Sequence, residues 1–310
     1  MPLISVVVCC HNRRDFLPQT MEAIFKQKYR PIEIVVLDDG SNDGTKELMS
    51  QYGERIRYYW QENKGIARTR TRACDLANGE FIAFQDDDDL MTPNRIVDLY
   101  DALMKYPNAI FSTGDYVFID PKGNIGKRWP PGDLDEYGPP RLIENAYHEI
   151  IWPNIPALPH TTLFRKESGN KIGWFDHDFK YASSDKDFYA RLARLGSIVY
   201  LRKVVSYYRR GHSSIWGNEI RAMYSRLQLL EKHLSLVDAN DAELYSRLQQ
   251  RILEALKRIA KLRSTGFSVD DSELEQHINR CIPLLRRKQR LAYVLYKNVK
   301  IPLRRLTYTR

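Results

Sequence analysis

The sequence predicts an α/β protein with a mostly parallel sheet flanked by helices and a helical appendage at the C-terminus. Strand-like apolar runs alternate with helix-like segments through the first 120 residues. The strand runs are almost continuously apolar, as expected where helices cover both faces of a sheet. After Gly217, no glycine occurs until Gly266 and no proline until Pro283, which favours long helices.

The predicted elements of the first half follow in chain order. Residues 4–10 (ISVVVCC) and 32–37 (IEIVVL) are apolar runs of strand length. Between them, apolar residues at helical spacing predict a helix from about Phe16 to Phe25. The remaining elements are a helix over 45–49, a strand over 56–60, a helix over 65–77, a strand from Phe81, and a helix that Pro93 opens and that ends near Lys105.

The second half is less regular. Residues 129–159 are rich in proline, glycine and aromatic residues, so we expect an irregular lid or binding wall. A helix is predicted over 184–195 and a strand over 197–208. Leu248, Ile252, Leu256 and Ile259 repeat at helical spacing, which predicts two or three amphipathic helices after Gly217. We therefore divide the chain into domains 1–215 and 216–310.

Charge and cysteine content narrow the class of protein. The net charge of +9 is concentrated at the end, since residues 282–310 contain nine basic residues and no acidic one. No apolar run is long enough to span a membrane, and the N-terminus lacks the features of a signal peptide. The four cysteines show no zinc-like spacing, which favours a reduced, cytosolic protein.

Two acidic clusters follow predicted strands: Asp38-Asp39 and Asp86 to Asp89. Ligands of parallel sheets bind beyond the carboxyl ends of the strands, where both clusters are expected. Several carboxylates can share a small volume around a divalent cation, and oxygen ligands alone suit Mg²⁺ or Mn²⁺. The alternative is a solvated loop that caps the Pro93 helix, a role that fits Asp89 best. A calcium EF-hand is excluded, because no glutamate stands at the twelfth loop position.

Three segments together resemble a known family. Residues 5–45 (SVVVCCHNRRDFLPQTMEAIFKQKYRPIEIVVLDDGSNDGT) are similar to the opening of the family 2 glycosyltransferases, which have the GT-A fold. Residues 65–93 (GIARTRTRACDLANGEFIAFQDDDDLMTP) resemble the block that ends in the family's D-x-D-D metal motif. Residues 183–196 (SSDKDFYARLARLG) resemble the block with the catalytic base. The resemblance implies a nucleotide-binding part over 1–120, an acceptor side over 121–215, and transfer of a sugar with inversion.

The resemblance also implies roles for individual residues. Asp39 would accept a hydrogen bond from the nucleotide base, most often uracil, and Asp185 would be the catalytic base. Asp88 would bind the metal directly, and Asp86 would act through the ribose or a water. Further donor-site residues are Asp38, His11, Arg13, Arg70, Asp87 and, in a segment that folds over the diphosphate, Arg209 and His212; candidate acceptor residues are His160 and Trp152.

Several of these residues have simpler interpretations. Asp185 could cap the helix that follows it, and Asp187 is expected at the surface. Arg13 could be an ordinary surface charge, His160 a structural histidine, and Trp152 a packing residue.

The C-terminal tail interleaves cations with apolar residues, as in segments that bind anionic lipid surfaces. We expect a cytoplasmic protein held peripherally on the inner membrane face, where a lipid-linked saccharide acceptor of surface polysaccharide or glycolipid synthesis would be presented. A solvated helix face is the alternative. No nucleic-acid-binding motif accompanies the charge. Two other functions are alternatives: a sugar-nucleotide pyrophosphorylase, which would need a glycine-rich N-terminal loop that this sequence lacks, and a non-catalytic scaffold for membranes or nucleic acid.

Overall fold

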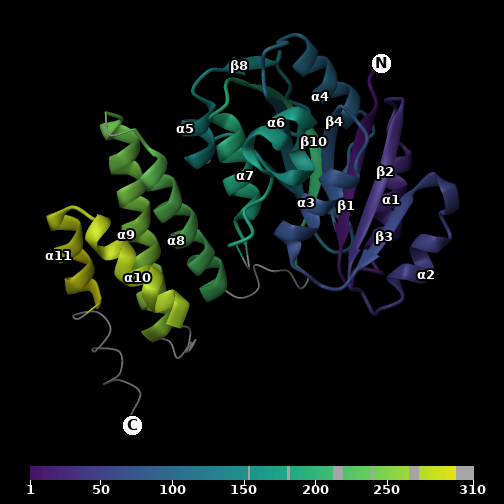
Figure 1. The fold of residues 1–310 in the computed structure, drawn as a ribbon. Helices are drawn as coiled ribbons and strands as arrows, with labels where there is room; N and C mark the ends of the chain where they lie inside the picture. Colours follow the sequence, from purple (N-terminus) through teal and green to yellow (C-terminus); the bar gives the residue numbers. More distant parts are fainter. Residues whose placement is uncertain (153, 180–181, 212–218, 239, 265–271, 298–310) are drawn as a thin grey trace. The chain divides into compact units, whose positions relative to one another are not determined.

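The computed structural model describes residues 1–152, 154–179, 182–211, 219–238, 240–264 and 272–297. These residues divide into two compact units, one within 1–178 and 184–212 and the other within 179–183 and 213–310. The first unit is α/β and the second is helical (Figure 1). The predicted fold class is confirmed.

The first unit is built on one mixed sheet. Among the described residues its central path runs β3-β2-β1-β4-β9-β6-β10-β5, with β7 beside β6 and β8 beside β10. β1 is parallel to β2 and β4, whereas β9 is antiparallel to both β4 and β6. The strands are β1 (Ile4–Cys10), β2 (Ile32–Asp39), β3 (Arg57–Gln61), β4 (Phe81–Asp86), β5 (Leu90–Met91), β6 (Phe111–Ile119), β7 (Ile125–Trp129), β8 (Arg141–Ile143), β9 (Thr162–Arg165) and β10 (Ile198–Arg209).

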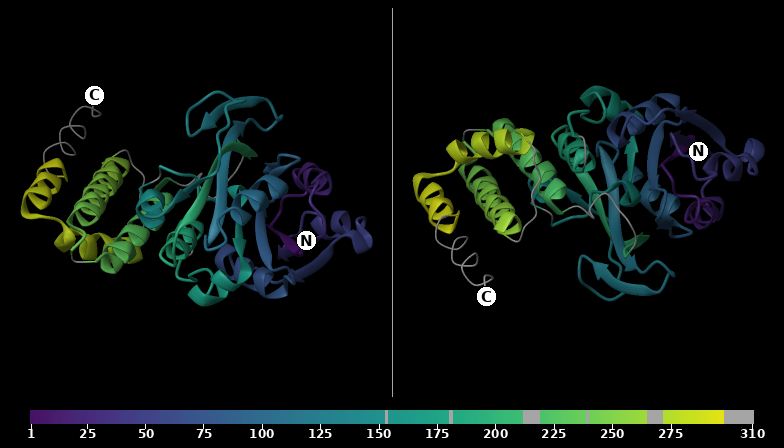
Figure 2. Two further views of the ribbon diagram at one scale, coloured as in Figure 1. Left: turned by 90° about the horizontal axis from the view of Figure 1, so that it is seen from above. Right: turned by 90° about the horizontal axis from the view of Figure 1, so that it is seen from below.

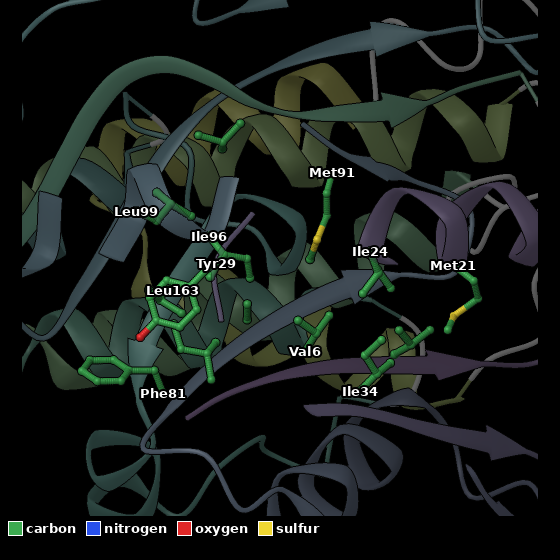
Figure 3. Packing of buried hydrophobic residues seen from close by; sticks show 14 of the residues in the cluster. Val6, Met21, Ile24, Tyr29, Ile34, Phe81, Met91, Ile96, Leu99 and Leu163 are labelled. Carbon is green, nitrogen blue, oxygen red and sulfur yellow. The ribbon is translucent and has the colours of Figure 1, made fainter. Parts of the chain in front are cut away.

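Helices cover both faces of this sheet, which explains the nearly continuous apolar strands (Figure 2). On one face, Val6 of β1 and Ile34 of β2 pack with Met21 and Ile24 of α1 and with Leu99 of α4 (Figure 3). On the other face, α3 packs against β1 and β2. The helices of this unit are α1 (Leu17–Phe25), α2 (Thr45–Ser50), α3 (Ile66–Leu76), α4 (Arg95–Met104), α5 (Ala146–Ile151), α6 (Lys166–Ile172) and α7 (Ser184–Ala193), with short 3₁₀ turns η1 (Gly53–Arg55) and η2 (Pro159–Thr161).

Most predicted elements lie within two residues of their positions, with two exceptions. α4 begins at Arg95 and Asn94 precedes it, so Pro93 stands before the helix instead of in its first turn. The expected irregular segment 129–159 contains β8 and α5. β8 forms because it pairs with β10, a partner distant in sequence that the local composition does not reveal.

The second unit contains four helices among the described residues, one more than the upper limit predicted. They are α8 (Glu219–Leu236), α9 (Ala242–Ser264), α10 (Ser272–Leu284) and α11 (Arg287–Leu295). Pro283 lies in the last turn of α10, and the chain restarts as a separate short helix after Arg286. None of the described helices has both the length and the apolar character needed to cross a lipid bilayer.

The four cysteines are buried and unbridged. Cys9 and Cys10 are neighbours on β1, and burial raises the pKa of the Cys9 thiol to about 12. A thiol with so high a pKa is protonated at neutral pH, which agrees with a structural role.

Candidate active site

The carboxyl ends of three neighbouring strands bring the two acidic clusters to one edge of the sheet. Cys10 of β1 is opposite Asp38 of β2, and Cys9 is opposite Asp86 of β4. β1 lies between β2 and β4, so the polar loop that begins at His11 after Cys10 follows the strand between the two acidic clusters. This is the edge at which the sequence predicted ligand binding.

Asp38 and Asp39 lie in different environments. Asp38 is fully buried, and its carboxylate accepts hydrogen bonds from the Ser41 amide (2.8 Å) and the Tyr58 hydroxyl (2.7 Å). It therefore shapes the loop and does not reach the surface where a nucleotide would lie. Asp39 accepts from the Gln61 side chain and from the amides of residues 64 and 65 at 2.7–2.9 Å. Three hydrogen bonds leave a carboxylate capacity for about one more.

His11 and Arg13 connect the β1 loop to both clusters. His11 Nδ1 donates to the Asp39 carbonyl at 2.9 Å, and the His11 amide donates to Asp87 Oδ2 at 3.3 Å. Arg13 Nε lies 3.8 Å from a carboxylate oxygen of Asp87 and equally far from one of Asp88. Arg13 therefore lies beside the acidic loop and is partly buried there.

Arg70 of α3 is the closest cation to Asp86. Its Nη2 donates to Asp86 Oδ1 at 2.7 Å, and its guanidinium lies near the rings of Phe84 and Phe175. Burial opposes the charge of this guanidinium, but the carboxylates of Asp86 and Asp185 outweigh burial and raise the Arg70 pKa. Arg70 thus links the acidic loop electrostatically to the predicted catalytic base.

Asp87 and Asp88 form the turn between β4 and β5, and each side chain keeps 16% of its surface exposed. Burial and the neighbouring Asp88 carboxylate raise the pKa of Asp87 well above its usual range, while Arg13 opposes the shift. Asp86 is somewhat more open, at 26%. These three carboxylates form the accessible side of the acidic loop.

Asp89 is fully buried, and its Oδ1 accepts a hydrogen bond from the Arg209 amide at 2.7 Å. The expectation that Asp89 caps the Pro93 helix is wrong, because the cap position is Asn94 and the Asp89 side chain points into the protein. Asp89 Oδ2 lies 3.8 Å from Nε2 of His160, which is only 2% exposed. Burial, together with the nearby Arg95 and Arg70 cations, lowers the His160 pKa well below its usual value.

That burial does not support His160 as an acceptor contact, because an acceptor sugar has no access to the ring. Trp152, the other candidate, is half-buried just after the end of α5, where its amide donates to the His148 carbonyl at 2.9 Å. His212 lies outside the described residues. Arg209 is buried and donates to the carbonyls of Asp88 (2.8 Å) and Pro121 (2.8 Å), so it holds the loops together instead of facing a diphosphate.

Asp185 is half-buried in the first turn of α7, and its Oδ1 accepts from the Lys186 amide at 2.8 Å. Asp187, expected at the surface, is fully buried and pairs with Arg191 at 2.7 Å. The physical reason is helical spacing, since residues 187 and 191 lie one turn apart on the inner face of α7. The more accessible Asp185 is the aspartate of this pair that could reach a substrate.

Arg95 is not among the residues that the sequence singled out, although it is the largest fully buried side chain among the described residues. Burial lowers its pKa to about 10, which still leaves it positively charged at neutral pH. A signal was present: Arg95, Leu99 and Ala102 follow the i, i+4, i+7 spacing of the inner face of α4.

The family model described as Glycosyl transferase family 2 matches residues 5–173. An uncharacterized glycosyltransferase of Rickettsia typhi, RT0329, is 28% identical over 207 residues, which are 66% of this chain and 63% of that protein. The putative teichuronic acid biosynthesis glycosyltransferase TuaG of Bacillus subtilis is 33% identical over 117 residues, 36% of this chain and 46% of TuaG. The chain thus spans less than two thirds of the length of these relatives.

Two solved structures share the fold. TarS 1–349 of S. aureus in complex with UDP-GlcNAc gives a TM-score of 0.67 at 19% identity, covering 99% of this chain and 93% of that one. The mannosyltransferase PcManGT from Pyrobaculum calidifontis, in complex with GDP-Man and Mn²⁺, gives 0.60 at 17% identity, covering 100% and 88%.

Proposed function

The chain belongs to glycosyl transferase family 2, and from that premise we propose that it transfers a sugar, with inversion, from a UDP-sugar to a saccharide or lipid-linked saccharide acceptor. The observation that carries the proposal is that Asp39 and Asp86 to Asp88 follow neighbouring strands at one edge of the sheet, where Arg70 bonds to Asp86 and attracts Asp185. TuaG, whose name refers to teichuronic acid biosynthesis, and TarS with UDP-GlcNAc support a donor of this class and a role in polysaccharide synthesis.

The donor would lie along the carboxyl ends of β1, β2 and β4. Asp39 has capacity for one more hydrogen bond, which a nucleobase N–H can donate. His11 Nδ1 donates to the main-chain carbonyl of Asp39, the Asn63 side-chain amide lies 3.4 Å from the same ring nitrogen, and Arg13 provides a cation within reach of a diphosphate. Aspartate specifies a base with an N–H facing it, so uracil fits this position.

A divalent cation, Mn²⁺ or Mg²⁺, fits the accessible side of the acidic loop. Asp88 and Asp86 are its proposed ligands, since hard cations prefer carboxylate oxygens and both side chains are partly exposed. Carboxylates that Arg13 and Arg70 only partly neutralise provide a suitable charge. When bound, the cation would stabilise negative charge on the departing nucleoside diphosphate. PcManGT in complex with GDP-Man and Mn²⁺ supports this assignment.

Asp185 is the proposed catalytic base. Its carboxylate would accept the proton of an acceptor hydroxyl while that oxygen forms a bond to the anomeric carbon. The bond from the anomeric carbon to the diphosphate oxygen breaks on the opposite face, and the electron pair leaves with UDP. Arg70 is close enough to Asp185 for the two charges to attract, and this attraction contributes to the raised pKa of Arg70.

We also propose that the helical unit holds the enzyme on an anionic membrane surface. On α11, Tyr293 is buried, whereas Leu291 and Val294 are 60% and 44% exposed. Exposed cations surround them: Arg286, Arg287, Lys288, Arg290 and Lys297. The rest of the basic tail, 298–310, lies outside the described residues. Vesicles with and without phosphatidylglycerol test this, since a Leu291→Ser/Val294→Ser variant should lose binding while Leu195→Ser, at another exposed leucine, should not.

Calorimetric titration with UDP tests the donor site. We expect binding that requires Mn²⁺ and that is lost in Asp88→Ala. Asp98→Ala is a matched control. The Asp98 side chain is similarly exposed (17%), but it lies on α4 and pairs with Lys203 of β10. If UDP does not bind with or without manganese, or binds equally well to the Asp88 variant, the proposed site is wrong.

A further inference from the structure

Five residues interrupt the α/β unit immediately before α7. The chain leaves that unit after Asp178, contributes residues 179–183 to the helical unit, and returns to the α/β unit at Ser184. Asp185, the proposed catalytic base, is the second residue of α7. The helical unit therefore includes the stretch of chain that leads directly to Asp185.

Helix α8 makes the contacts that hold this stretch. The Ala182 amide donates a hydrogen bond to Ser225 Oγ at 3.2 Å, and both residues are buried. Phe179 is also buried, and the Lys232 ammonium lies 5.4 Å from the centroid of its ring. Ser225 and Lys232 are seven residues apart, which is about two helical turns, so the two contacts come from the same face of α8.

The backbone of Ser183 adopts a conformation that needs support. Its φ of +68° lies in the left-handed region, which favours glycine. A serine stays in that region only where the surrounding structure fixes the chain. Ser183 is buried, the hydrogen bond from Ala182 to Ser225 precedes it, and α7 follows it. The turn into α7 is thus fixed at both ends.

The two ends of α7 are held in different ways. Beyond the first turn, Phe188 stacks on Phe175 with centroids 4.2 Å apart, and the Tyr189 hydroxyl accepts a hydrogen bond from the Thr162 hydroxyl at 2.6 Å. In the first turn, the amides of a helix have no partner within the helix, so the direction of that turn depends on the residues before it. Asp185 lies in this turn.

We propose that Ser225 of α8 is a positioning residue for the transfer reaction. By holding the Ala182 amide, it fixes residues 179–183 and, through them, the first turn of α7 and the carboxylate of Asp185. The inference rests on the proposed function, because it takes Asp185 as the catalytic base. Ser225 is fully buried in the helical unit, so it acts through the chain and not by contact with a substrate.

The consequence for catalysis follows from the geometry that a general base requires. Its carboxylate must lie within hydrogen-bond reach of the attacking hydroxyl, and a displacement of about 1 Å can reduce the rate by roughly 100-fold. Donor binding depends on other residues, at the ends of β1, β2 and β4. Loss of the Ser225 contact should therefore reduce turnover and leave donor affinity intact.

The kinetic test measures release of UDP from UDP-sugars, beginning with UDP-GlcNAc and with water as the acceptor. Ser225→Ala leaves the buried Ala182 amide without its acceptor, so turnover should fall roughly 10- to 100-fold while the donor KM and the calorimetric affinity for UDP stay unchanged. Ser225→Thr keeps a hydroxyl oxygen and should restore most of the turnover. Ser235→Ala is a matched control on the same helix, because the exposed Ser235 hydroxyl donates only to the Lys232 carbonyl.

Hydrogen exchange tests the same link without turnover. In Ser225→Ala, the amides of the first turn of α7 should exchange faster than in the wild type, while those of β1 should keep their rates. Ser235→Ala should change neither. If Ser225→Ala does not fold, Phe179→Leu allows the same comparison, since it keeps an apolar side chain and removes the ring near Lys232.

The two measurements separate this inference from the proposed function. If Ser225→Ala turns over like the wild type, if Ser225→Thr loses as much turnover as Ser225→Ala, or if exchange in α7 is unchanged, Ser225 does not position Asp185, while the proposed function stands. If the wild type releases UDP from no UDP-sugar, the proposed function fails, and the exchange rates still decide whether Ser225 holds the start of α7.

Discussion

Arg95 should hold the active-site edge together, and replacing it with methionine tests this directly. Its guanidinium is fully buried and donates to Gln85 Oε1 (2.8 Å) and the carbonyls of Phe84 (2.8 Å), Pro159 (3.0 Å) and Thr162 (3.2 Å). These acceptors lie on β4, on η2 and at the start of β9. One side chain therefore connects the strand that carries the acidic loop to the turn that carries His160.

The expected loss of stability follows from these hydrogen bonds. The two Nη2 hydrogens are shared among three carbonyls, so three hydrogens serve the four acceptors. At about 1.5 kcal/mol for each hydrogen donated by a charged group, they contribute roughly 4–5 kcal/mol to the free energy of unfolding. Methionine fills much of the same volume and has no buried charge to desolvate, which offsets part of the loss. We expect Arg95→Met to destabilise the α/β unit by about 2–4 kcal/mol. For a unit of this size, that lowers the melting temperature by roughly 4–16 °C.

Thermal melting, monitored through tryptophan fluorescence and circular dichroism, measures this loss of stability. Arg95→Lys should lose most of the same stability, because an ammonium cannot reach four acceptors arranged for a guanidinium. Arg68→Met is a matched control, since Arg68 also lies on a helix of this unit but is exposed. A melting temperature of Arg95→Met within about 2 °C of wild type would show that these contacts contribute little to stability.

Three further outcomes are expected. Asp185→Asn should reduce turnover by about 10²–10⁴-fold while calorimetry shows unchanged UDP binding; equal loss of binding would contradict a role as base. Asp187→Ala should lower the melting temperature of the protein, because it leaves the half-buried Arg191 without its carboxylate; a stability loss below about 1 kcal/mol in denaturant unfolding would argue against this. Gly169→Ala should destabilise the unit, since the added Cβ would lie 2.2 Å from the Trp174 ring; unchanged melting would mean that the ring moves aside readily.

The position of the site could be predicted from sequence because its determinants are local. The runs 4–10 and 32–37 are long enough and apolar enough to be buried strands, and the acidic residues follow such strands directly. Parallel pairing then aligns the strand ends without further information. Two of the three segments that resemble the family, 5–45 and 65–93, have the same character, since each includes a strand and the polar residues that follow it, whereas 183–196 lies on α7.

The orientation of individual acidic side chains could not be predicted. Asp86 to Asp89 are chemically identical in sequence, but the turn after β4 leaves Asp87 and Asp88 partly exposed and buries Asp89. Asp89 is buried because β5 pairs with β10, whose Arg209 amide donates to it. β10 is more than 100 residues away in sequence, and no local pattern specifies that contact. The same holds for β9, which lies between β4 and β6 although it follows both in the chain.

The structure also explains how a folded protein tolerates four consecutive aspartates. Arginines from separate elements surround the run: Arg70 bonds to Asp86, Arg13 lies near Asp87 and Asp88, and the Arg209 amide donates to Asp89. The guanidinium groups of Arg70 and Arg13 thus offset part of the negative charge of this run. Mn²⁺ alone should therefore bind weakly, and affinity should rise when a nucleoside diphosphate supplies further oxygen ligands and charge. Titrating Mn²⁺ with and without UDP measures this difference; equal affinities would show that the protein alone forms the complete metal site.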